Sequence, residues 1–228
     1  MQQMNEVRKS VVRISFTMTN PQCEEDPKED GQENIHMVIP GIIILVDANS
    51  CEIVAGSELL EQRLDDTLRL RLPTAAGYSA EFVAEPYTIG DNFSGFLVNG
   101  VDTQYIKEVQ FETLPVVKSQ DIFTFVFPRE TCMTPSGLWP GYVVDATPEY
   151  VFFIDCPCHE YAAFGSPVFN VRGQLVGMCY AFQSRIHTWA VRKLKSYFDK
   201  YLDEKQSGRI CYFKDGVQIS GKKIGLPE

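Results

Sequence analysis

The chain of 228 residues lacks the features that mark membrane and nucleic-acid-binding proteins. It has no run approaching the roughly 18 apolar residues that a bilayer-spanning helix needs. Its N-terminus has no basic segment followed by an apolar stretch, so we expect no secretory signal and no membrane partner. Basic residues are few, with 21 Lys and Arg against 30 Asp and Glu and a net charge of −9. We expect no nucleic-acid partner, because phosphates are held by a basic face.

Metal ligands are also scarce. The seven cysteines are odd in number and irregularly spaced, unlike the even set of a secreted disulfide framework. Cys156, Cys158 and His159 lie close together, but the chain has only three histidines and offers no second pair of ligands. We therefore expect reduced thiols in or near a core, no metal, no cofactor, and an intracellular location in the cytoplasm or nucleus.

A hydrophobic content of 44% and an aromatic content of 12% predict a packed core, in one large domain or two small lobes. The pattern is mostly that of short strands. The apolar run Val38–Val46, the turn at Asp47–Ser50 and the return over Cys51–Ala55 predict a buried hairpin. Further strands are expected at Val11–Phe16, Leu68–Leu72, Ser79–Glu85, Phe93–Val98, Tyr105–Glu112, Asp121–Phe127, Tyr142–Asp145, Tyr150–Ile154, Phe164–Asn170 and Gln174–Phe182. Short, regularly spaced strands indicate a sandwich or a barrel.

Two segments depart from this pattern. Residues 20–34 hold six acidic residues against Lys28, which predicts a solvated loop and leaves open a role as a surface for a basic partner. Residues 188–204 carry apolar side chains at intervals of three and four, which predicts an amphipathic helix. We expect it to pack on its own domain, with a membrane-surface or partner-binding helix as the alternative. The tail from Arg209 to Phe213 is expected to form a strand or hairpin.

Three segments carry a resemblance to a known family. Gly41–Leu60 is similar to a hairpin leading into a catalytic His, Asn92–Val98 to a strand that opens with a catalytic Asp, and Phe164–Met178 to a Ser-Gly-Gly-Pro hairpin around a nucleophile. Together they resemble the trypsin-like proteases of the intracellular HtrA/Deg branch, which includes divergent plant relatives. The resemblance covers residues 8–204 and implies an all-β, two-barrel trypsin-like fold with a C-terminal amphipathic helix.

The resemblance also implies a division of the chain. We expect an N-terminal barrel lobe at residues 1–113, containing the acidic loop, and a C-terminal barrel lobe at residues 114–206, ending in the helix. Residues 207–228 form the tail.

In the same alignment, the positions that hold the catalytic residues of the family hold other residues in this chain. Acyl transfer by this fold needs a hydroxyl nucleophile, an imidazole base and a carboxylate that orients the imidazole. The corresponding positions hold Phe164, Glu58 and Asn92, although a shift of one residue offers Asp91 for the last. A carboxylate with a pKa of ~4 is too weak a base to activate a serine. Ala162 replaces the Gly that contributes to the oxyanion hole.

The sequence therefore predicts a catalytically inactive protease homologue that acts as a protein-interaction module and binds a protein or an extended peptide. The expected contact surfaces are the groove near Glu58 and Phe164, the acidic Cys23–Asn34 loop and the Arg209–Glu228 tail. A third class of function is a subunit of an assembly whose other chains carry the chemistry.

The alternative is an active protease with an unorthodox site. It would use Ser166 with His159, or Cys158, as the nucleophile. Ser166 falls where the family has the second Gly of its motif and enters a strand, so we expect its hydroxyl to point away from the cleft or into packing.

Overall fold

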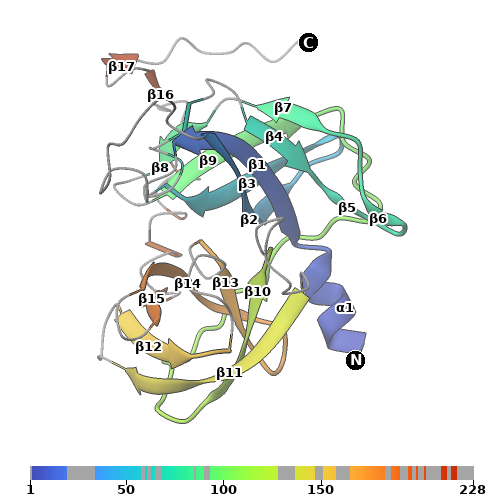
Figure 1. The fold of residues 1–228 in the computed structure, drawn as a ribbon. Coiled ribbons are helices and arrows are strands. Elements are labelled where there is room, and N and C mark those ends of the chain that lie inside the picture. The colour runs from blue at the N-terminus through green and yellow to red at the C-terminus, as the bar shows by residue number, and fades with distance from the viewer. Residues whose placement is uncertain are drawn as a thin grey trace.

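The computed structural model consists mainly of strands, arranged in two barrels (Figure 1). It describes residues 2–19, 34–57, 60, 63–64, 68–84, 86–89, 93–127, 137–146, 151–157, 165–182, 186–190, 195–196, 199, 203, 212–214 and 217–219. Within these residues, no helix is both long enough and apolar enough to cross a membrane.

The first barrel is a sheet of seven described strands in the order β7-β4-β1-β2-β3-β9-β8. All six pairings between neighbours are antiparallel. The strands are β1 (Val11–Thr19), β2 (Asn34–Val46), β3 (Ser50–Gly56), β4 (Leu68–Arg71), β7 (Phe82–Ala84), β8 (Tyr87–Ile89) and β9 (Phe93–Asn99). A separate small hairpin of β5 (Pro73–Thr74) and β6 (Gly77–Tyr78) follows β4.

The predicted hairpin of β2 and β3 is confirmed, and its packing explains its continuous apolar run. Alternate side chains on a strand point to opposite faces. Ile43 and Ile53 belong to the core of the first barrel, whereas Ile42 and Val54 belong to a cluster shared with the second barrel. Both faces are therefore buried, so the strands need apolar residues on both sides.

The second barrel is closed, in the order β10-β11-β12-β15-β14-β13. Its strands are β10 (Asp121–Val126), β11 (Gly137–Ala146), β12 (Val151–Asp155), β13 (Pro167–Asn170), β14 (Leu175–Phe182) and β15 (Ile186–Ala190). Its buried interior contains Ile122, Val143, Phe152, Ile154, Cys156, Val168, Val176, Cys179 and Ile186. The two barrels give the chain the expected all-β, two-barrel architecture.

A hydrophobic cluster joins the barrels, and we call it the interbarrel cluster. Its buried members are Val7, Val11, Val38, Ile42, Ile44, Val54, Phe93, Val109, Phe125, Phe127, Phe169, Leu175 and Met178. Tyr78 of the small hairpin packs edge-on against Phe127, with 5.7 Å between the ring centroids. Apolar burial is the main favourable term in association, so this cluster holds the barrels together.

The segment that connects the barrels corrects one expectation. Tyr105–Glu112 was expected to be a strand, but apart from an isolated bridge at Phe111 it is irregular. Its N–H groups at Lys107 and Val109 donate to Lys9 and Ile43 on the first-barrel side, at 3.0 and 2.8 Å. Farther along, the Leu175 N–H donates to the Gln110 carbonyl at 2.7 Å. The segment divides its hydrogen bonds between the two barrels, so it forms no regular ladder with either.

The start of the predicted C-terminal helix at 188–204 is also wrong. Thr188 and Ala190 belong to β15, which pairs with β12 and β14. Thr188 is fully buried in the second barrel, so tertiary pairing overrides the helical spacing of this segment. Lys195, Ser196, Asp199 and Asp203 have helical conformation, and the remaining positions of the predicted helix lie outside the described residues.

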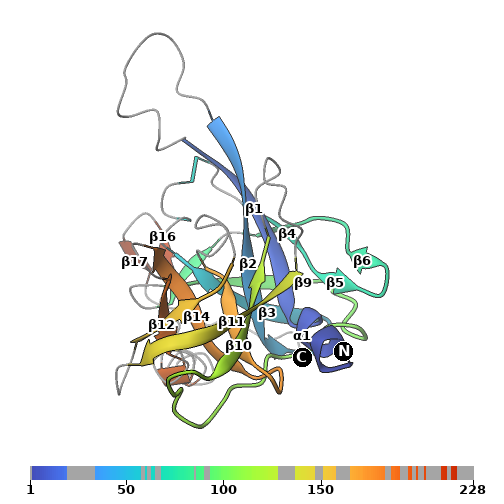
Figure 2. The ribbon, with the colours of Figure 1, turned by 60° about the horizontal axis from the view of Figure 1, so that its bottom comes forward.

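Three smaller features complete the fold. A short helix, α1 (Gln2–Arg8), precedes β1, and the strand expected at Ser79–Glu85 is reduced to β7. The tail forms the expected hairpin, made of β16 (Tyr212–Lys214) and β17 (Val217–Ile219). The far ends of β1 and β2 extend from the first barrel as a two-stranded ribbon (Figure 2). The acidic segment between them, residues 20–33, lies outside the described residues.

Candidate functional site

Among the candidate site residues, the structure describes only Ser166. The others lie outside the described residues, and they are Glu58, Asp91, Asn92, Cys158, His159, Ala162 and Phe164. Their immediate neighbours in the chain are described at Ser57, Phe93 and Gly165, and these fix where the segments leave the two barrels.

These neighbouring segments lie together at the junction of the barrels. Gly56, at the end of β3, pairs with Phe93, at the start of β9. A Cβ atom built on Gly56 would lie 3.5 Å from the Cα atom of Gly165, which is van der Waals contact. Ser57 is buried and Phe93 belongs to the interbarrel cluster. The chain segments that carry positions 58, 92 and 164 therefore leave the described structure within one small region.

Gly165 takes an unusual backbone conformation at this junction. Its φ of 71° lies in the left-handed region, which a residue with a Cβ atom adopts at a cost. Its N–H donates to the Cys179 carbonyl at 2.9 Å, which ties it to β14. A Cβ here would be 3.9 Å from the Pro40 carbonyl oxygen. The conformation, rather than lack of space, is what requires glycine.

Ser166 points into the second barrel. It is fully buried, and the Cys179 N–H donates to its carbonyl at 2.9 Å, which makes Cys179 its partner across the sheet. Residues that face each other across strands, and residues two apart along one strand, share a face. Cys179 and Val168 both belong to the core of this barrel. The Ser166 side chain therefore lies on the interior face rather than on the junction.

A second group of polar residues lies at the other end of β13, around Glu112. The side chain of Glu112 is only 6% exposed. Its Oε1 accepts the N–H groups of Thr113 and Leu114 at 2.8 and 3.0 Å, and its Oε2 accepts the Asn170 amide at 2.6 Å. The Arg172 guanidinium also donates to Oε2 and forms an ion pair.

This environment shifts the titration of Glu112. Burial acts to raise its pKa, but the Leu114 N–H, the Arg172 guanidinium and the Thr113 N–H outweigh that effect. The net result holds the pKa of Glu112 below its ordinary value. A buried carboxylate with charged and hydrogen-bonding partners stays ionised at neutral pH.

Asn170 extends this network into the turn between β13 and β14. Its Oδ1 accepts the N–H groups of Arg172 and Gln174 at 2.9 and 3.0 Å, while its amide also donates to Gln174 at 3.1 Å. One side chain therefore closes the turn and joins it to the connecting segment. Sequence reasoning missed this cluster, because Glu112 and Asn170 are 58 positions apart and neither stands in a local motif.

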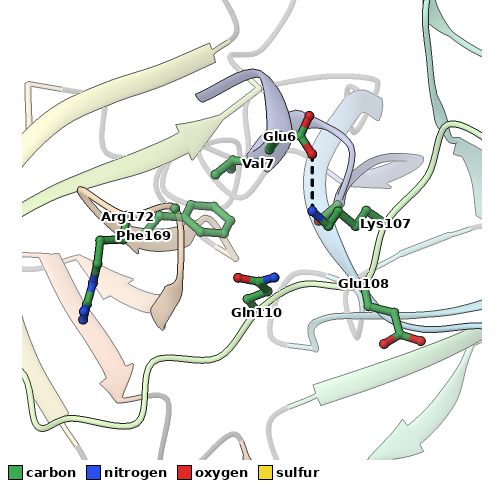
Figure 3. A pocket seen from close by; sticks show the side chains of 9 residues that line it. Glu6, Val7, Lys107, Glu108, Gln110, Phe169 and Arg172 are labelled. Atoms are coloured by element: carbon green, nitrogen blue, oxygen red, sulfur yellow. Dashed lines mark hydrogen bonds and ion pairs between the residues drawn. The ribbon is translucent and has the colours of Figure 1, made fainter. Parts of the chain in front are cut away.

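A pocket of about 200 Å³ lies beside this cluster (Figure 3). It is lined by Glu6, Val7, Ser10, Lys107, Glu108, Gln110, Phe169, Arg172 and Gly173. Glu6 accepts hydrogen bonds from Lys9 and Lys107 at 2.7 and 3.3 Å, and these contacts hold the pKa of Glu6 below its ordinary value. Most charges around the pocket already have partners, so it offers no convergent set for an ion.

The described cysteines are free, buried thiols at Cys51, Cys156 and Cys179. Burial raises the pKa of Cys51 and of Cys179 to about 12 in each case. A thiol this weakly acidic is a poor nucleophile and metal ligand. The described residues contain no cluster of three or more His, Cys, Asp or Glu that could hold a metal ion.

Comparison with solved structures finds the same fold in HtrA/Deg-type trypsin-like serine proteases. Deg5 superposes with a TM-score of 0.58 at 14% identity, over 86% of this chain and 90% of that chain. The Rv3671c protease in an inactive form gives 0.59 at 11%, over 87% and 92%. An inactive serine-to-alanine variant of Rv3671c from M. tuberculosis H37Rv gives 0.58 at 12%, over 87% and 89%.

No family model matches the sequence, and no curated protein matches it. The solved structures establish that this chain has the trypsin-like protease fold. At such low identity a shared fold does not carry the chemistry, which has to be argued from this chain's own residues.

Proposed function

We propose that this protein is a catalytically inactive trypsin-like protease homologue that acts as a protein-interaction module. The observation that carries the proposal is that all three triad positions are replaced in a chain that keeps the fold. Glu58, Asn92 and Phe164 stand where the resemblance places the base, the orienting acid and the nucleophile. Together they supply no hydroxyl and no imidazole, and acyl transfer by this fold needs both.

The burial of Ser166 supports the proposal against the main alternative. A nucleophile has to reach the carbonyl carbon of a bound substrate, so its hydroxyl must face the cleft. Ser166 is fully buried and lies opposite Cys179, on the interior face of the second barrel. Its use in catalysis would require opening the β13–β14 pairing.

The partner we propose is a protein or an extended peptide. Gly56, Phe93 and Gly165 keep the described edges of the junction in contact, which supports the proposal of a groove between the barrels. An extended peptide can bind such a groove through backbone hydrogen bonds without any reaction. The acidic Cys23–Asn34 loop and the Arg209–Glu228 tail are further proposed surfaces. We also propose an intracellular location, in the cytoplasm or nucleus.

The proposal is tested by capture followed by measurement on defined peptides. Proteins retained from source tissue by the immobilised chain are identified, and candidate segments are synthesised as extended peptides. We expect a peptide to bind and to be recovered intact, and Phe164→Ala to weaken its affinity. Val171→Ala is the control, because Val171 is an exposed apolar residue at the opposite end of β13. Cleavage of the peptide at a defined bond would overturn the proposal.

Restoring the base and the nucleophile by substitution tests separately the proposal that the chain is catalytically inactive. We expect Glu58→His combined with Phe164→Ser to give no efficient turnover, because Asn92 and Ala162 remain. The orienting carboxylate and the oxyanion-hole glycine would still be missing. Robust peptidase activity of this double variant would show that the groove is better preserved than we propose.

A further inference from the structure

Strand β13 is in contact with elements outside its own barrel at both of its ends. Just before its first residue, Gly165 lies against Gly56 of the first barrel. At its last residue, Asn170 donates to Glu112 of the connecting segment at 2.6 Å. The connecting segment is in turn bound to the first-barrel side through the Lys107 and Val109 N–H groups. One short strand therefore links the Glu112 cluster to the candidate site.

The strand is well suited to transmit a displacement from one end to the other. All four of its residues are buried. It pairs with β10 through Ile122↔Asn170 and Thr124↔Val168, and with β14 through Pro167↔Met178. Close-packed interiors have low compressibility and transmit strain, so a shift at Asn170 is passed along β13.

We propose that Glu112 is a positioning residue whose carboxylate holds the Asn170 end of β13 and thereby keeps Gly165 in contact with Gly56. This role goes beyond the proposed function, since it concerns the geometry of the junction whether or not the site binds or reacts. The groups that position the strand are the Glu112 carboxylate, the Asn170 amide and the Arg172 guanidinium. The strand, β13, is paired on both sides.

The ionised form of Glu112 is the form that holds the strand. Among the described residues, the charged group that faces it is Arg172, from the β13–β14 turn, and the neutral partners are Asn170 and the N–H groups of Thr113 and Leu114. Every one of these partners donates a hydrogen bond. A protonated carboxyl would place an O–H donor against partners that are themselves donors, and it would lose the attraction to the Arg172 guanidinium. Acid therefore weakens the contact between Glu112 and the Asn170 end of β13.

The test is amide hydrogen exchange measured by NMR in the full-length protein. The reporters are the N–H of Gly165, which donates to Cys179, and the N–H of Cys179, which donates to Ser166. The references are the N–H groups of Ser79 and Val101, which donate to carbonyls of the first barrel. The quantity compared is the ratio of reporter to reference exchange rates, because a loss of global stability alone would not selectively accelerate the reporters.

We expect Glu112→Gln to raise this ratio by about tenfold or more. The substitution removes one charge-assisted hydrogen bond, and this loss favours local opening of the β13–β14 pairing. Arg172→Gln should raise it in the same direction, and it is the second variant if Glu112→Gln does not fold. Glu108→Gln is the matched control, since Glu108 is an exposed acid of the same segment that, within the described part of the chain, accepts only the Val46 N–H. It should leave the ratio unchanged.

An acid series on the unmodified protein gives a readout that needs no variant. The ratio should rise as the pH falls below the ordinary Glu value of 4.5, and this rise should be absent in Glu112→Gln. Equal acceleration of reporters and references in Glu112→Gln and Arg172→Gln, with no acid dependence of the ratio in the unmodified chain, would overturn the proposal. That result would show that Glu112 contributes to global stability and does not position β13.

Discussion

Gly56 of the first barrel and Gly165 of the second lie in contact, with 3.5 Å between a Cβ built on Gly56 and the Cα of Gly165. The contact stands where the segments carrying positions 58 and 164 leave the described structure. It joins the two halves of the molecule beside the segments to which the motif resemblance assigns the triad positions, and our proposal is that the reactive groups are replaced there.

The two glycines are predicted to respond differently to alanine. Gly165→Ala should cost about 1–2 kcal/mol of unfolding free energy, because a Cβ is disfavoured at its φ of 71°. Gly56→Ala should cost less, because its Cβ meets an ordinary contact. Gly100→Ala is the control for conformation alone, with a φ of 73° and open space around it. Denaturant titrations measure all three, and a Gly165→Ala cost well below that of Gly100→Ala would contradict the account.

A buried hydroxyl in the second barrel is predicted to be dispensable. Thr124 is fully buried opposite Val168, and its Oγ1 has no hydrogen-bond partner among the described residues. Thr124→Val removes an unsatisfied polar atom and should be neutral or stabilise the fold by up to about 1 kcal/mol. Thr188→Val is the matched control, because the equally buried Thr188 hydroxyl contacts Cys179 Sγ at 3.8 Å. A Thr124→Val variant less stable than Thr188→Val would refute this prediction.

Protonation of Glu112 in acid is predicted to lower the free energy of unfolding. Its pKa is lower in the folded chain than its ordinary value of 4.5, so the folded state binds the proton less readily than the unfolded state. The contribution is therefore complete above pH 4.5 and is lost as the pH falls through the lower, folded pKa. Glu112→Gln should cost about 1–3 kcal/mol at pH 7 and flatten the decline below pH 5. An unchanged acid slope in that variant would count against the assignment.

The buried thiols are predicted to resist alkylation. With a pKa of about 12, Cys179 is ionised to roughly one part in ten thousand at pH 8, and burial also blocks reagent access. Pulse labelling with iodoacetamide, read peptide by peptide, should leave Cys51 and Cys179 unmodified in the folded protein. Both should react after denaturation. Labelling of Cys179 at the same rate in the folded and the denatured chain would show that the second barrel opens readily.

The strands were predicted from the sequence wherever burial alone fixes the pattern. The hairpin of β2 and β3 was predicted correctly because both of its faces are buried and the turn at Asp47–Ser50 separates two apolar runs. The predicted strands Phe164–Asn170 and Gln174–Phe182 are likewise separated by a turn, in which Gly173 has a φ of 77°. In both cases local composition and tertiary packing favour the same structure.

The errors occur where distant contacts decide the structure. Thr188 and Ala190 have neighbours at helical spacing, but β12 and β14 provide strand partners on both sides. The α1 helix is too short for a sequence signal and is held by Val7 in the interbarrel cluster and by the contacts of Glu6 with Lys9 and Lys107. Nothing local to Tyr105–Glu112 indicates that its hydrogen bonds are divided between two barrels.

The candidate site was predictable only in part. Aligned motifs predicted positions 58, 92 and 164, and the described segments beside them meet at one junction. Whether these residues form a groove stays a prediction. The Glu112 cluster was not predictable, because its polar partners come from separate segments that only the fold brings together.

The central claim is that the fold persists without a working nucleophile and base. The most direct measurement is intact-mass spectrometry after incubation of the folded protein with a fluorophosphonate probe, with an active trypsin-like protease in parallel. The account predicts an adduct on the active protease and none on this chain. An adduct that maps to Ser166, disappears in Ser166→Ala and accompanies peptide hydrolysis would contradict it.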